Sequence, residues 1–168
     1  MLFLLYSAVG TVLYLILSLC RPLVEKVGGR WAYGLTERLG CYPHIETNPG
    51  DRALWLHASS VGEVQAALVL INELTKSCAD LRVVLTTTTE QGHRLACSRL
   101  PVEITCLMAP LDLPQAVRRV LRTFRPDLYV CLETELWPVM LTTLRRAGVT
   151  MALVNGRLSE RSCRGYLY

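Results

Sequence analysis

The fold of this chain is indicated by a strand-to-helix junction, His-Ala-Ser-Ser-Val-Gly-Glu at residues 57–63. An apolar stretch with the character of a strand, 53–58, leads into it, and a stretch with helical periodicity, 62–76, leads out. The same alternation continues with predicted strands at 82–88, 104–108, 128–132 and 150–154 and predicted helices at 90–99, 113–124 and 138–147. Repeated β-α-β units predict an α/β fold, with a Rossmann-like, doubly wound parallel sheet.

Polar or turn-forming residues follow each predicted strand. They lie in the junction at 57–63 and in four later loops, Thr86–Gly92, Pro110–Pro114, Glu133–Pro138 and Asn155–Ser162. In an open parallel sheet such loops share the edge where ligands bind, because helix N-termini point free N–H groups there. The chain has neither Gly-x-Gly-x-x-Gly nor Gly-Lys-Ser/Thr, which argues against a nucleotide-dependent oxidoreductase and against a P-loop protein.

The N-terminus is apolar. Residues 2–20 carry no charged side chain, and at about 1.5 Å of rise per residue a helix of this length crosses the ~30 Å hydrocarbon layer of a bilayer. The charges that follow, Arg21, Lys26 and Arg30 with one glutamate among them, place the rest of the chain in the cytoplasm. A cleaved signal peptide is the competing interpretation, but the apolar run lacks a preceding positive charge and a small-x-small cleavage site.

Three regions are therefore expected in the 168 residues, which suffice for one sizeable core. Residues 1–20 form a membrane anchor. Residues 21–50 form an amphipathic juxtamembrane connector that ends in the turn Asn48-Pro49-Gly50. Residues 51–168 form the Rossmann-like domain.

Basic residues are concentrated toward the C-terminus. The net charge is +4, and residues 117–168 hold nine arginines against four acidic residues. Aromatic stacking residues are not interleaved with these arginines, so anionic lipid headgroups or a phosphorylated partner fit them better than nucleic acid. Arg118, Arg122 and Arg125 fall on one face of helix 113–124, where a solvated surface and a membrane or phosphate contact are the two interpretations.

The cysteines and histidines give no metal pattern along the sequence. The seven cysteines contain no Cys-x-x-Cys pair, and most fall within predicted helices or strands. This predicts reduced, packed thiols in a cytosolic compartment rather than a disulfide framework or a zinc site. His44, His57 and His93 lack metal-ligand spacing, so we expect no metal at them.

Glu63 has two interpretations. It lies in the first turn of its helix, where the helix dipole favours a carboxylate, and this alone explains a glutamate there. Beside a glycine-containing turn at the end of a strand, the same carboxylate could also remove the proton from a substrate hydroxyl as a general base.

Glu133 and Glu135 are two residues apart where a strand ends, so in extended geometry they would face the same side. N-capping of the helix that starts at Pro138 and stabilisation of positive charge on a sugar ring explain them equally well. In the last loop, Arg157 and Arg161 flank a predicted helix start, which suits anion binding, while Ser159 as an N-cap explains the same segment structurally.

Five motifs occur in an order that is typical of one family. They are His-Ala-Ser-Ser-Val-Gly-Glu (57–63), Thr-Thr-Thr-Thr-Glu-Gln-Gly (86–92), Pro-Leu-Asp-Leu-Pro (110–114), Glu-Thr-Glu-Leu-Trp-Pro (133–138) and Asn-Gly-Arg-Leu-Ser-Glu-Arg-Ser (155–162). Together with the apolar N-terminus, they resemble the N-terminal half of the 3-deoxy-D-manno-octulosonic acid (Kdo) transferases of lipopolysaccharide synthesis. The resemblance spans essentially the whole chain.

The resemblance implies an inverting, metal-independent glycosyltransferase with two Rossmann-like domains, the GT-B type, which needs no cofactor. Such an enzyme transfers Kdo from CMP-Kdo to a lipid A precursor at the cytoplasmic face of the bacterial inner membrane. It implies Glu63 as the general base and Glu133 as the transition-state stabiliser. The implied substrate-binding residues are Ser60, Gly62, Glu135, Arg157, Ser159 and Arg161.

Two features depart from the family pattern. Val139 stands where the family usually has asparagine, and family members are more than twice as long as this chain. We therefore expect residues 51–168 to be the acceptor domain, with the C-terminal donor domain absent and the isolated chain inactive, because both substrates must be held together for transfer. The alternative is a non-catalytic, membrane-anchored module that binds a glycolipid or a partner protein.

Overall fold

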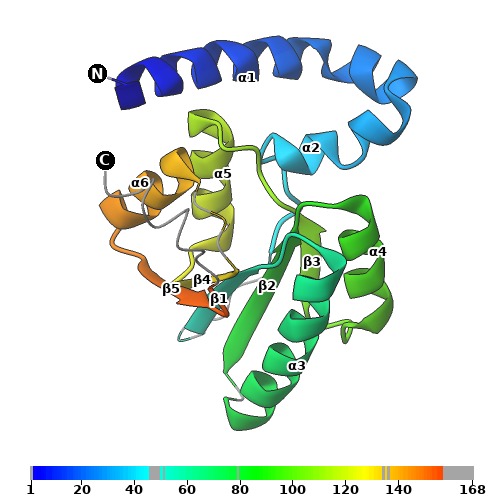
Figure 1. Ribbon diagram of the computed structural model, residues 1–168, viewed down its shortest axis with the longest axis vertical. Helices are drawn as coiled ribbons and strands as arrows, with labels where there is room; N and C mark the ends of the chain where they lie inside the picture. Colours follow the sequence, from blue (N-terminus) through cyan, green and yellow to red (C-terminus); the bar gives the residue numbers. More distant parts are fainter. Residues whose placement is uncertain are drawn as a thin grey trace.

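The computed structural model describes residues 2–45, 50, 52–78, 80–133, 135 and 137–156 (Figure 1). Its elements are α1 (Leu2–Val27), the 3-10 helix η1 (Gly29–Ala32), α2 (Leu35–Arg38), β1 (Arg52–His57), α3 (Val61–Ser77), β2 (Leu81–Thr87), α4 (Glu90–Arg99), β3 (Thr105–Met108), α5 (Pro114–Phe124), β4 (Leu128–Leu132), α6 (Pro138–Arg146) and β5 (Thr150–Val154). Every predicted strand and helix from residue 53 onward is present, and each end lies within one residue of its predicted position.

The five strands form one sheet in the order β3-β2-β1-β4-β5, and all neighbouring pairs are parallel. The predicted Rossmann-like parallel sheet is confirmed. Because β1 is central and pairs with both β2 and β4, the loops that follow these three strands are neighbours at one edge of the sheet. We call the edge at which the strands end the carboxyl edge.

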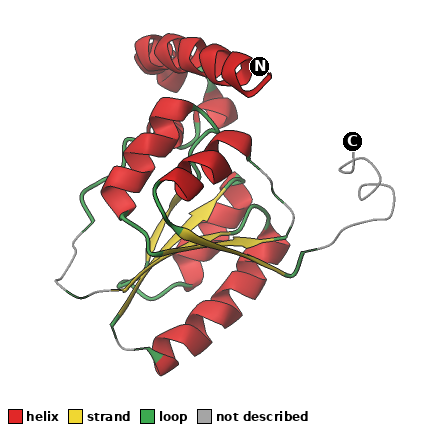
Figure 2. Ribbon diagram, turned by 90° about the vertical axis from the view of Figure 1, so that its left-hand side faces the viewer, coloured by secondary structure: helices red, strands yellow, loops and turns green. Residues whose placement is uncertain are grey.

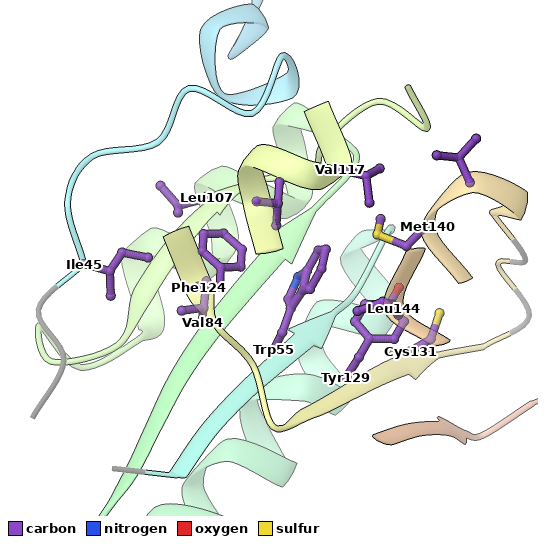
Figure 3. Close-up of a cluster of buried hydrophobic side chains, with 12 residues drawn as sticks. Ile45, Trp55, Val84, Leu107, Val117, Phe124, Tyr129, Cys131, Met140 and Leu144 are labelled. Carbon is purple, nitrogen blue, oxygen red and sulfur yellow. The ribbon is translucent and has the colours of Figure 1, made fainter. Parts of the chain in front are cut away.

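Helices cover both faces of the sheet (Figure 2). Alternate strand residues point to opposite faces, so Trp55 packs with α5 and α6, whereas Leu54 and Leu56 pack with α3 and α4. Figure 3 shows the first of these two cores, in which the Trp55 ring meets Phe124 and Tyr129 edge-on at centroid distances of 5.3 and 4.9 Å. The two cores fix the strands that carry the loops of the carboxyl edge.

The N-terminal helix α1 lies across the top of the domain in Figure 1 and is long and apolar enough to cross a membrane. It extends to Val27, so the predicted boundary at residue 20 falls inside it. Only 11% of the most apolar 18-residue stretch of α1 is buried in the protein. Its buried residues are Gly10 and Tyr14, and Tyr14 joins Leu35, Leu39, Leu113 and Ala116 in a small apolar cluster.

The position of α1 against the domain depends on a close approach at Gly10. A Cβ atom there would lie 3.2 Å from Cδ of Pro114, so a larger residue would have to shift α1 or Pro114 by a few tenths of an ångström. One turn earlier, the Tyr6 hydroxyl donates to Asp112 Oδ2 at 3.1 Å. Asp112 lies in the β3–α5 loop and Pro114 is the first residue of α5, so α1 is docked where a loop of the carboxyl edge leads into its helix.

Candidate functional site

The loops after β1, β2 and β4 bring a set of polar side chains together at the carboxyl edge. His57, at the end of β1, is in register with Thr86 of β2 and with Cys131 of β4. Glu63 follows β1 and opens α3, while Glu133 and Glu135 follow β4. The topology therefore gathers residues that are up to 78 positions apart in the sequence, as in the pair His57 and Glu135.

Glu63 and Ser60 form the N-terminal cap of α3. The Ser60 hydroxyl accepts from the Glu63 N–H at 3.3 Å and donates to Glu63 Oε1 at 2.8 Å. The other carboxylate oxygen, Oε2, accepts from the Ser59 N–H at 2.7 Å. The structural interpretation of Glu63 as a capping residue is thus confirmed. Each oxygen keeps a second lone pair for a further donor.

Gly62 lies exposed in the first turn of the same helix. A Cβ atom there would meet only the Ser60 hydroxyl, at 4.0 Å. Packing therefore does not require glycine at this position, and the space above the first turn of α3 is open to solvent.

His57 is buried and holds Glu135. Its Nε2 lies 2.9 Å from Glu135 Oε2, and its Nδ1 lies 3.1 Å from the Thr86 hydroxyl. The indole N–H of Trp137 donates to the same Oε2 at 3.1 Å. Because an ionised carboxylate only accepts, Nε2 carries the ring hydrogen in the bond to Glu135. These bonds fix the orientation of Glu135 from two directions.

The same bonds favour the ionised form of Glu135. The hydrogen bond from His57 is the largest cause, and with those from Ser59 and Trp137 it lowers the pKa of Glu135 to about 2, although burial acts in the opposite direction. Ser59 thus acts on both carboxylates, because its N–H donates to Glu63 at 2.7 Å and its side chain helps to lower the pKa of Glu135. Glu63 and Glu135 belong to one polar cluster.

Replacing Glu135 with glutamine is expected to reduce the loss of unfolding free energy that occurs as the pH falls below about 4.5. The folded-state pKa lies below the ordinary value of 4.5, so the ionised carboxylate stabilises the fold above about pH 4.5, and this stabilisation is lost as the pH falls toward 2. Because 27% of the side chain is exposed, solvent screening limits the effect to about 2 kcal/mol. Urea denaturation of wild type, E135Q and E103Q at a series of pH values measures it. In E103Q, which removes a carboxylate from an exposed turn, the free energy of unfolding should fall with decreasing pH as it does in wild type. The same fall in E135Q would contradict the bond from His57 to Glu135.

Glu133 does not have the geometry expected from the sequence. Its φ is 62°, in the left-handed region, so the prediction that extended backbone points Glu133 and Glu135 to the same side is wrong. The Glu133 N–H still donates to the Val154 carbonyl at 3.0 Å, which continues the pairing of β4 with β5 by one residue. A non-glycine residue held at positive φ costs on the order of 1 kcal/mol and is frequent at functional sites.

Asp112 ties the β3–α5 loop to α6. Its carboxylate is buried and accepts from the N–H of Val139 at 3.0 Å and of Met140 at 2.7 Å. Trp137, the N-cap residue of α6, provides no side-chain cap, so Asp112 replaces it from another loop. Asp112 also accepts from Tyr6, as described above, and therefore joins α1, α6 and the carboxyl edge.

A small cavity of about 50 Å³ adjoins this site. It is lined by Arg38, His57, Thr88, Ala109, Pro110, Leu111, Asp112, Trp137 and Met140. Two larger hollows lie elsewhere, at about 310 Å³ between the ends of α3 and α4 and about 440 Å³ beside Tyr42 and Arg122. We place the site at the carboxyl edge nevertheless, because the polar side chains and helix N-termini converge there.

The sequence-predicted residues are placed as follows. Ser60, Gly62, Glu63, Glu133 and Glu135 lie at the carboxyl edge, and Arg157, Ser159 and Arg161 lie outside the described residues. Sequence reasoning missed the partnership of His57 with Glu135 and the role of Asp112. The sequence placed His57 at the end of one strand and Glu135 after another strand of the same sheet, but it did not indicate that these two strands are neighbours.

A Rossmann-like parallel sheet with an apolar N-terminal helix and carboxylates along its carboxyl edge has the architecture of the N-terminal domain of a GT-B glycosyltransferase. Residues 33–168 match the family model described as 3-deoxy-D-manno-octulosonic-acid transferase (kdotransferase), N-terminal glycosyltransferase domain. The chain therefore belongs to the Kdo transferase family.

Curated relatives agree with this assignment. The chain is 32% identical over 158 residues to the 3-deoxy-D-manno-octulosonic acid transferase of Haemophilus influenzae, an alignment that covers 90% of the chain and 37% of the relative. It is 33% identical over 142 residues to the enzyme of the same name from Chlamydophila psittaci, covering 83% and 32%. A probable mitochondrial 3-deoxy-D-manno-octulosonic acid transferase of Arabidopsis thaliana is 34% identical over 126 residues, covering 75% and 28%. The chain thus spans about a third of the length of these relatives.

Proposed function

We propose that this chain is the acceptor-binding half of a Kdo transferase, which transfers Kdo from CMP-Kdo to a lipid A precursor at the cytoplasmic face of the inner membrane. The observation that carries the proposal is the docking of α1 on the β3–α5 loop through Gly10 and Tyr6. A membrane-embedded α1 would hold the carboxyl edge close to the bilayer surface, where the headgroup of a glycolipid lies.

Glu63 would act as the general base. In this step an acceptor hydroxyl donates its proton to Glu63 while its oxygen forms a bond to the anomeric carbon of Kdo. The bond from that carbon to the phosphate oxygen breaks, and CMP leaves with the bonding electrons, with inversion at the carbon. The bonds from Ser59 and Ser60 fix the carboxylate of Glu63 before the substrate arrives, and the open space at Gly62 gives the hydroxyl a path to it.

The other carboxylates would stabilise the positive charge that develops on the sugar ring. Glu133, which directly follows β4, is the proposed stabiliser, and Glu135, two residues further along the loop, is held ionised by His57. Arg157, Ser159 and Arg161 are proposed to bind anionic groups of the substrates. Neither a metal nor a cofactor is assigned a role in this reaction.

A second candidate function is a non-catalytic glycolipid-binding module on the membrane. The observation that favours it is the cap of α3, because both oxygens of Glu63 already accept hydrogen bonds that stabilise the helix. In that case the fold would need Glu63 while no reaction would use it.

A chimera tests the proposal against this alternative. The chain is joined to the portion of the Haemophilus influenzae relative that lies beyond the aligned region, and the product is assayed in membranes for Kdo transfer from CMP-Kdo to a lipid A precursor. Transfer by the chimera, and not by the added portion alone, would support the proposal. Binding of the precursor by a folded chimera without transfer would favour the binding module.

A further inference from the structure

A cluster of one histidine and two cysteines lies away from the carboxylates of the candidate site. His93 and Cys97 are one turn apart on α4, and Cys106 lies on the neighbouring edge strand β3 (Figure 1). One ligand atom from each residue lies within 4.8 Å of the other two. Spacing along the sequence did not predict this group, because one of its members comes from a different element.

The separations approach those of a tetrahedral zinc site. With Zn–N and Zn–S bonds of about 2.0 and 2.3 Å, the nitrogen and sulfur ligands of such a site lie roughly 3.5 Å apart. His93 Nε2 is 3.5 Å from Cys97 Sγ. Small side-chain rotations would bring the three ligand atoms, now within 4.8 Å of one another, around one ion.

His93 also has a hydrogen-bond partner on its other ring nitrogen, as metal-binding histidines usually have. The Tyr33 hydroxyl lies 2.9 Å from His93 Nδ1, which leaves Nε2 free to bind a metal, and Nε2 is the ring nitrogen nearer to Cys97 Sγ, at 3.5 Å against 3.9 Å for Nδ1. Metal-binding histidines almost always have their second ring nitrogen hydrogen-bonded, which fixes the ring orientation. The Arg94 guanidinium in turn lies over the Tyr33 ring, 5.6 Å from its centre.

We propose that His93, Cys97 and Cys106 bind one zinc ion, with the fourth position open to water. Two thiolates and an imidazole are ligands that zinc prefers, and the exposure of Cys97 leaves that position accessible. The ion would tie α4 to the edge strand β3 and, through Tyr33, to the segment between η1 and α2. This inference is independent of the proposed function, because neither Glu63 nor Glu133 takes part.

The test is cobalt binding by the whole 168-residue chain, purified in detergent, stripped with a chelator and kept reduced. Co²⁺ reports thiolate ligands by a charge-transfer band, whereas Zn²⁺ has a filled d shell and is silent. We expect one Co²⁺ per chain with this band, and displacement by one equivalent of Zn²⁺. C97S and C106S should each weaken binding at least 100-fold, and Y33F, which keeps all three ligands, should weaken it roughly 10-fold.

C78S and H44A are the matched controls, since they remove a cysteine and a histidine outside the cluster, and they should bind as wild type does. Far-UV circular dichroism checks that each variant is folded. Weak binding without a charge-transfer band would overturn the proposal, as would wild-type affinity in both C97S and C106S. Unchanged affinity in Y33F would remove the positioning role of Tyr33.

Discussion

Replacing Glu63 with glutamine is expected to lower the rate of Kdo transfer by roughly 10²- to 10⁴-fold, the usual contribution of a general base. Glutamine is nearly isosteric and cannot accept the proton of the acceptor hydroxyl. Its amide oxygen still accepts from the Ser59 N–H, and its NH₂ group donates to the Ser60 hydroxyl, so the cap of α3 is retained. The loss should therefore appear in kcat, with the KM for the lipid A precursor changed only a few-fold.

The measurement uses the chimera, with wild type, E63Q and E73Q assayed side by side in membranes. Glu73 is an exposed residue of the same helix and pairs with Lys76 at 2.9 Å, so E73Q removes a carboxylate far from the carboxyl edge. E73Q should transfer at the wild-type rate. If E63Q matched E73Q in rate, Glu63 would be a capping residue alone, and the general base would have to be sought elsewhere.

The fold was predictable because each β-α unit repeats the same local pattern. Apolar strands such as 128–132 end at polar turns, and helices such as 113–124 show apolar residues at helical spacing. The order of the strands, β3-β2-β1-β4-β5, was not predicted, because right-handed crossovers and the doubly wound class allow more than one order. The continuation of α1 to Val27 was not predicted, because charges at Arg21 and Lys26 interrupt the apolar run without interrupting the helix.

The sequence predicted which residues form the candidate site, but it did not predict their conformations or the hydrogen bonds between them. Sequence spacing placed Glu133 and Glu135 after the same strand, but the conformation of Glu133 depends on how its backbone continues the pairing with β5. The bond from His57 to Glu135 depends on the order of strands in the sheet, which no local pattern contains. Contacts between distant residues of this kind require the tertiary fold.

Asp112 links the two halves of the proposed function, the membrane helix and the catalytic loops. One of its oxygens accepts from Tyr6 of α1 and Val139 of α6, and the other accepts from Met140 of α6. The start of α6 directly follows Glu135 and Trp137, so its position sets that of the loop beside His57. A single buried carboxylate thus couples the docking of α1 to the geometry of the carboxyl edge.

Replacing Asp112 with alanine is accordingly expected to destabilise the protein by about 3 kcal/mol, because two backbone N–H groups of α6 and the Tyr6 hydroxyl would lose their acceptor in a buried site. Urea denaturation in detergent, followed by tryptophan fluorescence, to which the fully buried Trp55 contributes, measures the change. Y6F removes only the bond from α1 and should cost about 1 kcal/mol, while D80A, which removes an exposed carboxylate, should lie within about 0.5 kcal/mol of wild type. An equal loss in Y6F and D112A would assign the effect to the docking of α1. A loss confined to D112A would assign it to the cap of α6, and a D112A variant as stable as D80A would refute both roles.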